Sequence, residues 1–281
     1  MRNANPLILF SLICFVLSSC MKNGGTTGPS GTSGNSKFLV KSFETTIYDT
    51  SLANTLDQYT ISYSYDNNNR QLSALEEGTS TYKGIASNIS DTFNFSYSQN
   101  TKTETGVVHQ GTISSTSSII NYLNSSGFPD SAMSLASSGN ISLDMSMIYH
   151  YDANNYCTEI DYSQNLNNAG YQPSGKTVYT VSGGNVTQAQ SYGANGNLLR
   201  TQTLTYSGSS NNTEVSPSIP PLSGHLNNDL VQSTDITILG TTRSSLSYSY
   251  TYDSQNRVSS ITVKTPSGNI FLEETNIKYV N

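Results

Sequence analysis

One feature limits the possible folds of this chain more than any other: apolar or aromatic residues alternate with Ser and Thr over long stretches. In "LSYSYTY" (246–252), Leu246, Tyr248, Tyr250 and Tyr252 share one parity, and Ser or Thr fills the other. Successive side chains of a β-strand point to opposite faces, so this period predicts a strand with one apolar and one polar face. Such strands are typical of an antiparallel sheet that is packed on one side.

The same alternation returns along the chain, and no stretch carries a convincing helical period. It is clear in residues 57–66, 91–99, 141–152 and 200–208. The chain has 19 Tyr and 21 Gly, and only 11% of its residues are charged, a bias that favours strands and turns. We therefore predict an all-β fold, a large antiparallel up-and-down meander of hairpins. Because free sheet edges are a liability, we expect this sheet to be curved or closed into a barrel-like form.

Three of the aromatic stripes end in the same pattern, Tyr-x-Tyr-Asp-x-x-Asn, at 63–69, 149–155 and 250–256. An Asp side chain can bond the backbone two residues further on, and Asn tolerates the left-handed conformation that a tight reversal needs. The repeat therefore predicts hairpin turns. The predicted turn residues are Asp66, Asn69, Asp152, Asn155, Asp253 and Asn256.

The register after the turn has two possible forms. A two-residue loop would place Tyr252 opposite Arg257 and Tyr65 opposite Arg70, with a cation–π contact in each pair. It would also put Ile261 on the tyrosine face. The equivalent pairing in the other two repeats also matches apolar with apolar residues. A bulge at Asn256 would change the parity and put Val258 on the tyrosine face instead.

The first twenty residues form an export signal. Arg2 precedes an apolar run at 7–17, which is too short to span a bilayer as a helix but suits the core of a cleaved signal. The Leu-x-x-Cys pattern that ends at Cys20 resembles the bacterial lipoprotein signal. We predict that residues 1–19 are removed and that Cys20 is lipidated, which would hold the protein on a membrane.

The mature chain divides into a tether and one domain. Residues 20–36 begin with the lipidated cysteine and continue as a flexible segment of Gly, Ser, Thr and Asn. Residues 37–281 form a single all-β domain, with a long proline-containing loop at 207–235.

The charge and the cysteines exclude several classes of protein. The net charge is −6, and removal of Arg2 with the signal makes it more negative, so nucleic acid is not an expected partner. With Cys14 lost in the signal and Cys20 lipidated, Cys157 has no cysteine to pair with in the mature chain.

A possible catalytic group involves one of the three histidines. On the two-residue register His150 lies opposite Cys157, with Glu159 two residues further on the same polar face. A Cys-His-carboxylate group can support nucleophilic catalysis. The equivalent positions in the sister hairpins carry no such chemistry, so we interpret this group as ordinary decoration of a solvent-facing surface. We expect no enzyme activity, no metal site and no cofactor.

Two pairs of adjacent carboxylates are also not interpreted as catalytic or metal sites. Glu273 and Glu274 lie in a predicted strand and must point to opposite faces. Glu76 and Glu77 are placed near a loop.

The Tyr-Asp hairpins resemble the YD repeats of RHS shell proteins. The whole layout is similar to an uncharacterised family of Bacteroidota lipoproteins, a domain of unknown function with a porin-like fold. This likeness covers about residues 37–281. It is carried by the signal at 17–20, "YSYDNNNRQLSAL" (63–75), "VYTVSGGNVTQ" (178–188), "YTYDSQNRVSSITV" (250–263) and the final "IKYV" (277–280).

That resemblance implies an outer-membrane lipoprotein of the cell envelope with no established activity. Surface-exposed lipoproteins of that phylum tend to carry acidic residues after the cysteine, whereas Met21, Lys22 and Asn23 follow here, which favours the periplasmic side. Asp130-Ser131-Ala132 resembles the O-glycosylation acceptor of the same phylum.

Two functions remain open. The first is a non-catalytic binding module for a glycan, a small apolar ligand or an envelope protein. The second is a structural or accessory component of an outer-membrane assembly, with no small-molecule ligand. A membrane-spanning barrel is disfavoured because its strands need an apolar outward band, and a lipid anchor would be redundant. The expected partners are therefore the membrane, through the anchor, and an unknown ligand or envelope protein.

Overall fold

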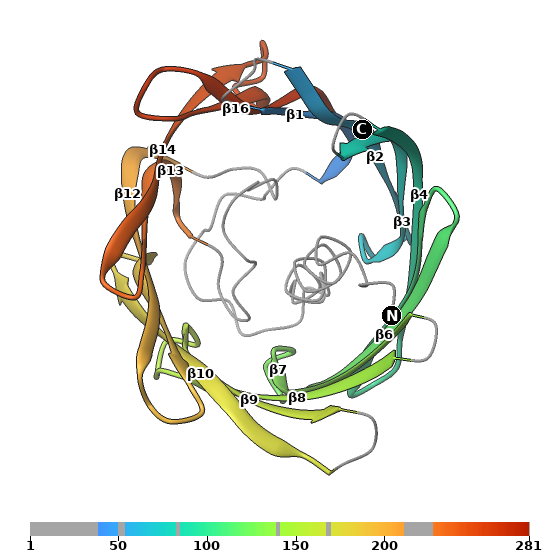
Figure 1. The fold of residues 1–281 in the computed structure, drawn as a ribbon, viewed down its shortest axis with the longest axis vertical. Coiled ribbons are helices and arrows are strands. Elements are labelled where there is room, and N and C mark those ends of the chain that lie inside the picture. The colour runs from blue at the N-terminus through green and yellow to red at the C-terminus, as the bar shows by residue number, and fades with distance from the viewer. Residues whose placement is uncertain are drawn as a thin grey trace.

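The computed structural model describes residues 39–49, 54–82, 85–138, 141–166, 170–210 and 227–280, which form 16 antiparallel strands (Figure 1). Each strand pairs with its neighbours in the chain, and β1 pairs with β16, so the sheet closes into a barrel. The predicted all-β antiparallel meander is therefore confirmed in its closed form. Among the described residues, no helix is long and apolar enough to cross a membrane.

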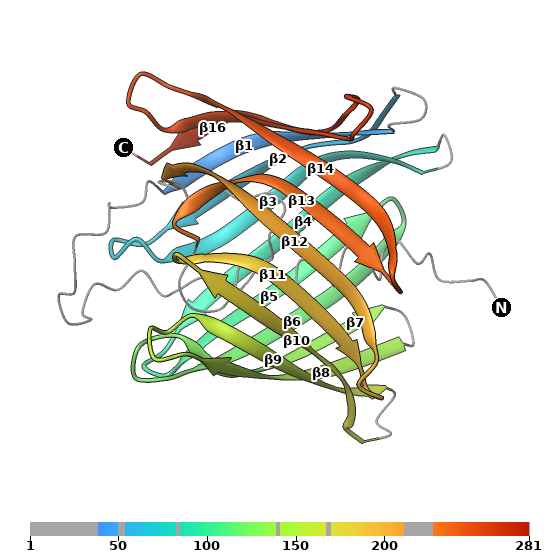
Figure 2. The same cartoon turned by 90° about the vertical axis from the view of Figure 1, so that its left-hand side faces the viewer.

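The strands are seven to thirteen residues long and run obliquely around the barrel (Figure 2). Their bounds are β1 (Val40–Asp49), β2 (Asn54–Tyr65), β3 (Gln71–Tyr82), β4 (Ile85–Tyr97), β5 (Thr101–Gln110), β6 (Ile113–Leu123), β7 (Pro129–Ser138), β8 (Ile141–Tyr151), β9 (Cys157–Leu166), β10 (Gln172–Ser182), β11 (Asn185–Gly193), β12 (Leu198–Ser210), β13 (Asp229–Ile238), β14 (Thr241–Tyr252), β15 (Val258–Lys264) and β16 (Ile270–Tyr279).

The predicted loop at 207–235 is too long at both ends. Strand β12 continues to Ser210 and β13 already begins at Asp229, because these two residues pair with each other. Residues 211–226 lie outside the described residues, as do the signal, Cys20 and the tether.

The tyrosine face of the sheet points into the lumen. Side chains such as Phe93, Ile119 and Ile261 on this face are at most 2% exposed, whereas Ser and Thr of the other face are mostly exposed or half-buried. Side chains on the convex outside of a barrel diverge and cannot bury one another to this extent, but those on the concave side converge. The apolar stripes therefore form the interior, and the hydroxyl-rich stripes form the outer wall.

The luminal face packs in three apolar clusters. The largest extends over β1 and β11–β16 and contains Val258, Ile261 and Val263, each at most 1% exposed. A second joins β6–β9, and a third joins β3–β5 around Phe93. The Phe93 ring packs directly against Gly106, where a side chain would not fit, because a Cβ would lie 2.7 Å from two ring carbons.

The three Tyr-Asp hairpins close by the same turn. In the third, the Asp253 N–H donates to the Arg257 carbonyl at 2.8 Å, and Asp253 Oδ1 accepts from the N–H groups of Gln255 and Arg257 at 2.9 Å. Asn256 takes the left-handed conformation with φ of 58°. Asp66 with Asn69, and Asp152 with Asn155, repeat this geometry, with φ of 60° and 62° at the two asparagines.

The two-residue register is wrong, and the bulged alternative describes the turn. Tyr252 pairs with Val258, not with Arg257, and a register shift separates this pair from Thr251 and Ser260. Ile261 stays on the tyrosine face, opposite Tyr250, and Val258 joins it. The left-handed Asn256 is the physical reason, because it turns the chain one residue later than a two-residue loop does.

The arginine after each of two turns contacts the next hairpin. Arg70 lies 4.9 Å from the centre of the Tyr97 ring, and Arg257 lies 4.5 Å from that of Tyr279, so the expected stacking on Tyr65 and Tyr252 is not observed. Both guanidinium groups also bond the turn aspartate through Nε, at 2.6 and 2.7 Å. Arginine therefore connects its own turn to the adjacent strand.

A ring of tyrosine hydroxyls stabilises this end of the barrel. On six even-numbered strands, a tyrosine donates its O–H to a backbone carbonyl near the start of the preceding strand, at 2.5 to 2.9 Å. The pairs are Tyr65 with Val40, Tyr97 with Gln71, Tyr151 with Pro129, Tyr206 with Val186, Tyr250 with Val231, and Tyr279 with Val258.

The left-handed asparagine gives a direct test of the turn. We expect Asn256→Val to lower the free energy of unfolding by about 1–2 kcal/mol, because a β-branched residue is strained at positive φ. Asn256→Gly should be close to neutral, since glycine adopts this conformation freely. Urea unfolding followed by circular dichroism measures both; equal stability of the Val variant would contradict the turn geometry.

Two glutamates interrupt the apolar lumen. Glu76 on β3 and Glu274 on β16 are 5% and 4% exposed, and burial raises the pKa of each from its ordinary value of 4.5 to about 8. Asp91, opposite Glu76, contributes to the Glu76 shift, and burial raises the Asp91 pKa to about 6. The two glutamates are therefore mostly protonated in the folded protein at neutral pH.

These pKa values predict how stability depends on pH. Between about pH 4.5 and 8 the folded chain binds more protons than the unfolded chain, so the free energy of unfolding must fall as pH rises through this window. We expect the Tm to decrease from pH 5 to pH 8.5, and Glu76→Gln with Glu274→Gln to flatten that decrease. An unchanged slope in the double variant would show that these carboxyls are ionised in the fold.

Candidate functional site

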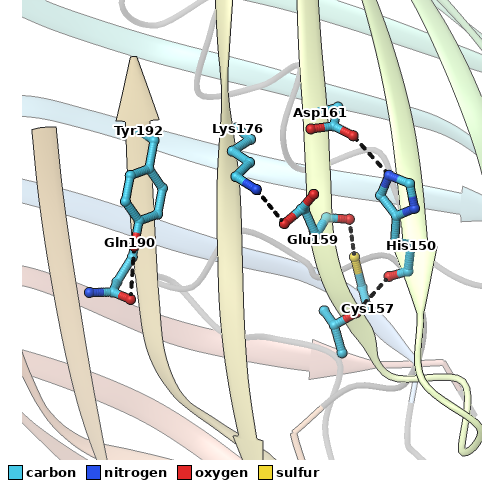
Figure 3. A network of polar contacts seen from close by, with 8 residues as sticks. His150, Cys157, Glu159, Asp161, Lys176, Gln190 and Tyr192 are labelled. Atoms are coloured by element: carbon cyan, nitrogen blue, oxygen red, sulfur yellow. Dashed lines mark hydrogen bonds and ion pairs between the residues drawn. The ribbon is translucent and has the colours of Figure 1, made fainter. Parts of the chain in front are cut away.

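A network of charged side chains lies on the outer wall across β8, β9 and β10 (Figure 3). His150 Nε2 is 2.8 Å from Asp161 Oδ2, and Lys176 Nζ donates to Glu159 Oε2 at 3.0 Å. The hydrogen bond and the negative charge of Glu159 raise the pKa of Lys176. The antiparallel pairing brings these residues together, since His150 lies opposite Glu159 and Asp161 lies opposite Lys176.

A pocket adjoins this network at the end of the β10–β11 pairing, next to Gly175 and Gly193. Its volume is about 490 Å³, and its polar lining is Asp161, Lys176 and Tyr192. The Tyr192 hydroxyl donates to Gln190 Oε1 at 3.3 Å, which holds the ring along β11 (Figure 3). Val178, Pro173 and Ala194 supply apolar lining, so the pocket combines one aromatic ring, apolar surface and two opposite charges.

Glycines line one edge of the pocket and keep that edge free of side chains. At Gly175, φ is +139°, and a Cβ there would lie 2.1 Å from the Tyr192 carbonyl oxygen. A side chain at this position would therefore push the two strands apart, because the contact is with backbone. Gly193 and Gly196 line the same edge and add no side-chain bulk.

The Cys-His-carboxylate group that the two-residue register would form is not assembled. His150 and Glu159 do face each other on the outer wall, but Cys157 pairs with Tyr151, is 2% exposed and packs with the luminal cluster of β6–β9. Its thiol donates to the Glu159 carbonyl at 3.6 Å. The register shift between His150 and Tyr151 moves Cys157 to the opposite face, so it cannot act as a nucleophile beside His150.

The same wall carries the one group of described residues with metal-ligand character. One donor atom each of His150, Glu159 and Asp161 lies within 4.8 Å of the others. All three side chains are at least partly exposed, and both carboxylates already have a cationic or histidine partner. Charge pairing accounts for the group as it stands.

Sequence reasoning missed the pocket residues, although a signal for the pairing existed. Asp161 and Lys176 have the parity of the polar face on their strands, and the hairpin between them places them opposite each other. The six turn residues, Asp66, Asn69, Asp152, Asn155, Asp253 and Asn256, lie at hairpin ends and not in the pocket. The lipidation of Cys20 stays a prediction, because that residue lies outside the described part.

Comparison with known proteins supports the fold alone. A porin-like protein from Bacteroides uniformis superposes with a TM-score of 0.59 at 15% identity, covering 86% of this chain and 98% of that protein. A porin-like protein from Bacteroides vulgatus gives a TM-score of 0.51 at 11% identity, over 86% and 99% of the two chains. No protein-family profile and no curated protein matches this sequence.

The position of Cys157 can be checked chemically. We expect a water-soluble maleimide to leave Cys157 unmodified in the folded protein and to modify it fully in urea, because the thiol is buried in the lumen. Peptide mass spectrometry locates the label. Rapid labelling under native conditions would show that Cys157 is exposed on the outer wall, as the two-residue register requires.

Proposed function

We propose that this chain is a non-enzymatic lipoprotein of the cell envelope that binds a glycan at the outer-wall pocket. The observation that carries the proposal is the pocket itself, in which Tyr192 lies beside Asp161 and Lys176 on paired strands. A tyrosine ring offers a large apolar contact at low entropic cost, and the carboxylate and ammonium groups bond sugar hydroxyls.

A glycan suits this site better than a small apolar ligand does. The polar groups converge on the pocket from β9, β10 and β11, and the surrounding outer wall is rich in Ser and Thr. Neighbouring hydroxyl pairs such as Thr205 with Ser233 and Thr116 with Ser137 already bond each other at 2.8 Å. An extended polyhydroxyl chain could continue such contacts beyond the pocket.

The porin-like fold does not by itself imply a pore in a lipid bilayer. A membrane-spanning barrel turns an apolar band outward. Here the described outward positions of β14 include Ser245, Ser247, Ser249 and Thr251, and the apolar residues are luminal. We infer that the lipid anchor at Cys20 attaches the barrel to the outer membrane, facing the periplasm.

A second candidate is the docking of an envelope protein. Met133, Leu135 and Ile148 on β7 and β8 are 44%, 48% and 51% exposed on the outer wall, next to the charged network. Exposed apolar patches rimmed by polar residues are common at protein interfaces. This observation favours the structural or accessory role over a small-molecule ligand.

A glycan array probed with the full-length protein in detergent tests the first candidate. We expect binding to be weakened at least tenfold, about 1.4 kcal/mol, by Tyr192→Ala and by Asp161→Asn. Tyr122→Ala is a matched control, because Tyr122 is an exposed tyrosine of the outer wall on β6, outside the pocket.

The outcomes separate the two candidates. Absence of any glycan ligand, or binding that survives Tyr192→Ala, contradicts the pocket proposal. Chemical crosslinking in cells tests the second candidate. A crosslink to an envelope protein that is lost in the double variant Met133→Ser with Ile148→Ser would instead support docking of a partner protein.

A further inference from the structure

A row of polar side chains crosses the otherwise apolar luminal face of five neighbouring strands. It runs from Glu274 on β16 through Thr45 on β1 and Tyr59 on β2 to Glu76 on β3 and Asp91 on β4. Thr45 lies directly opposite both Glu274 and Tyr59, and Glu76 lies directly opposite Asp91. Apart from Tyr59, each member is at most 5% exposed. We call this set the luminal carboxyl row.

Two carboxyl oxygens in the row have no hydrogen-bond donor. They are Oε2 of Glu76 and Oε2 of Glu274, both fully shielded from solvent. Native structures rarely leave a buried acceptor unsatisfied, and the usual resolution is a bound ion, water or ligand. Both side chains belong to the luminal face of one continuous sheet, so a ligand that donates to them would bind from the lumen.

The acidic side chains of the row suit a positive group, because a nearby positive charge favours the ionised form of a carboxyl. The described luminal positions of β1–β4 and β16 carry four carboxyls, those of Asp57, Glu76, Asp91 and Glu274, and no Lys or Arg. The nearest luminal ammonium, Lys102 on β5, lies 4.9 Å from the Phe95 ring centre, further along the wall. The phenol of Tyr59 lies between the two glutamates, and after burial their negative charges are the main causes that raise its pKa.

We propose that the luminal carboxyl row binds a linear polyamine, with ammonium groups at Glu76–Asp91 and at Glu274 and an alkyl segment across Tyr59. Glu76 and Glu274 are three strand spacings apart, about 14 Å along the wall, which is too far for one metal ion to contact both. A divalent cation would also need six or more oxygens around it. Two separated ammonium groups fit two separated carboxyl sites, and the tyrosine face attracts a cation as well.

This site is independent of the glycan pocket. It lies on the luminal face of β16 and β1–β4, whereas the pocket lies on the outer face of β9–β11. Binding would ionise carboxyls that are neutral in the empty row, so each polyamine should release protons to the solvent.

Isothermal titration of spermidine into the full-length protein in detergent at pH 7 tests the proposal. We expect saturable binding whose heat differs between buffers of different ionisation enthalpy, which measures the released protons. Glu76→Gln and Glu274→Gln should each weaken binding at least tenfold. Because Gln resembles the neutral carboxyl in size and polarity, both variants should keep the fold, which circular dichroism verifies.

The chain offers a matched control beside the site. Glu77→Gln removes the adjacent carboxylate on the outer wall and should leave spermidine binding unchanged. Absence of binding at millimolar spermidine, equal weakening by Glu77→Gln, or equal affinity for Ca²⁺ or ethylamine would each overturn the proposal. The first would show an empty row, the second surface binding, and the third a site that does not recognise two ammonium groups.

Discussion

The pairing of β1 with β16 is the constraint on which the rest of the structure depends. Once Val40 pairs with Tyr279 and Ile47 with Leu272, no sheet edge remains and every strand has a concave and a convex face. The alternation of the sequence then assigns each residue to the lumen or to the outer wall. Burial of aromatic and aliphatic side chains in the lumen supplies the stabilisation, and the outer wall carries mostly Ser and Thr, with a few charges and the apolar patch of β7 and β8.

The repeated geometry of the three Tyr-Asp hairpins stabilises this closure at one end of the barrel. In two of them, the turn aspartate orients an arginine, the arginine stacks on the tyrosine of the neighbouring strand, and that tyrosine bonds the carbonyl just after the arginine. Each turn is thereby coupled to the next hairpin. The opposite face of the wall is free of this requirement, so it can carry the charged network and the pocket.

The sequence alone predicts the fold class well, because the period of two is a local property of each strand. The period of two does not determine the strand register, which depends on the conformation of the turn. The left-handed Asn155 shifts the pairing after the turn and moves Cys157 into the lumen. Glu76 and Glu274 could have been noticed from their parity, which is that of the apolar face on their strands. The outer-wall pocket could not, because it arises from the contact between Gly175 and the Tyr192 carbonyl on another strand.

The central claim is that the apolar face is luminal and the hydroxyl face meets water. A nitroxide attached through Ser249→Cys in a Cys157→Ser background, with the full-length protein reconstituted in liposomes, tests it by power-saturation electron paramagnetic resonance. The account predicts that a water-soluble nickel chelate relaxes the label strongly and that oxygen does so weakly. Strong relaxation by oxygen with exclusion of the chelate would place the outer wall in lipid and contradict the account.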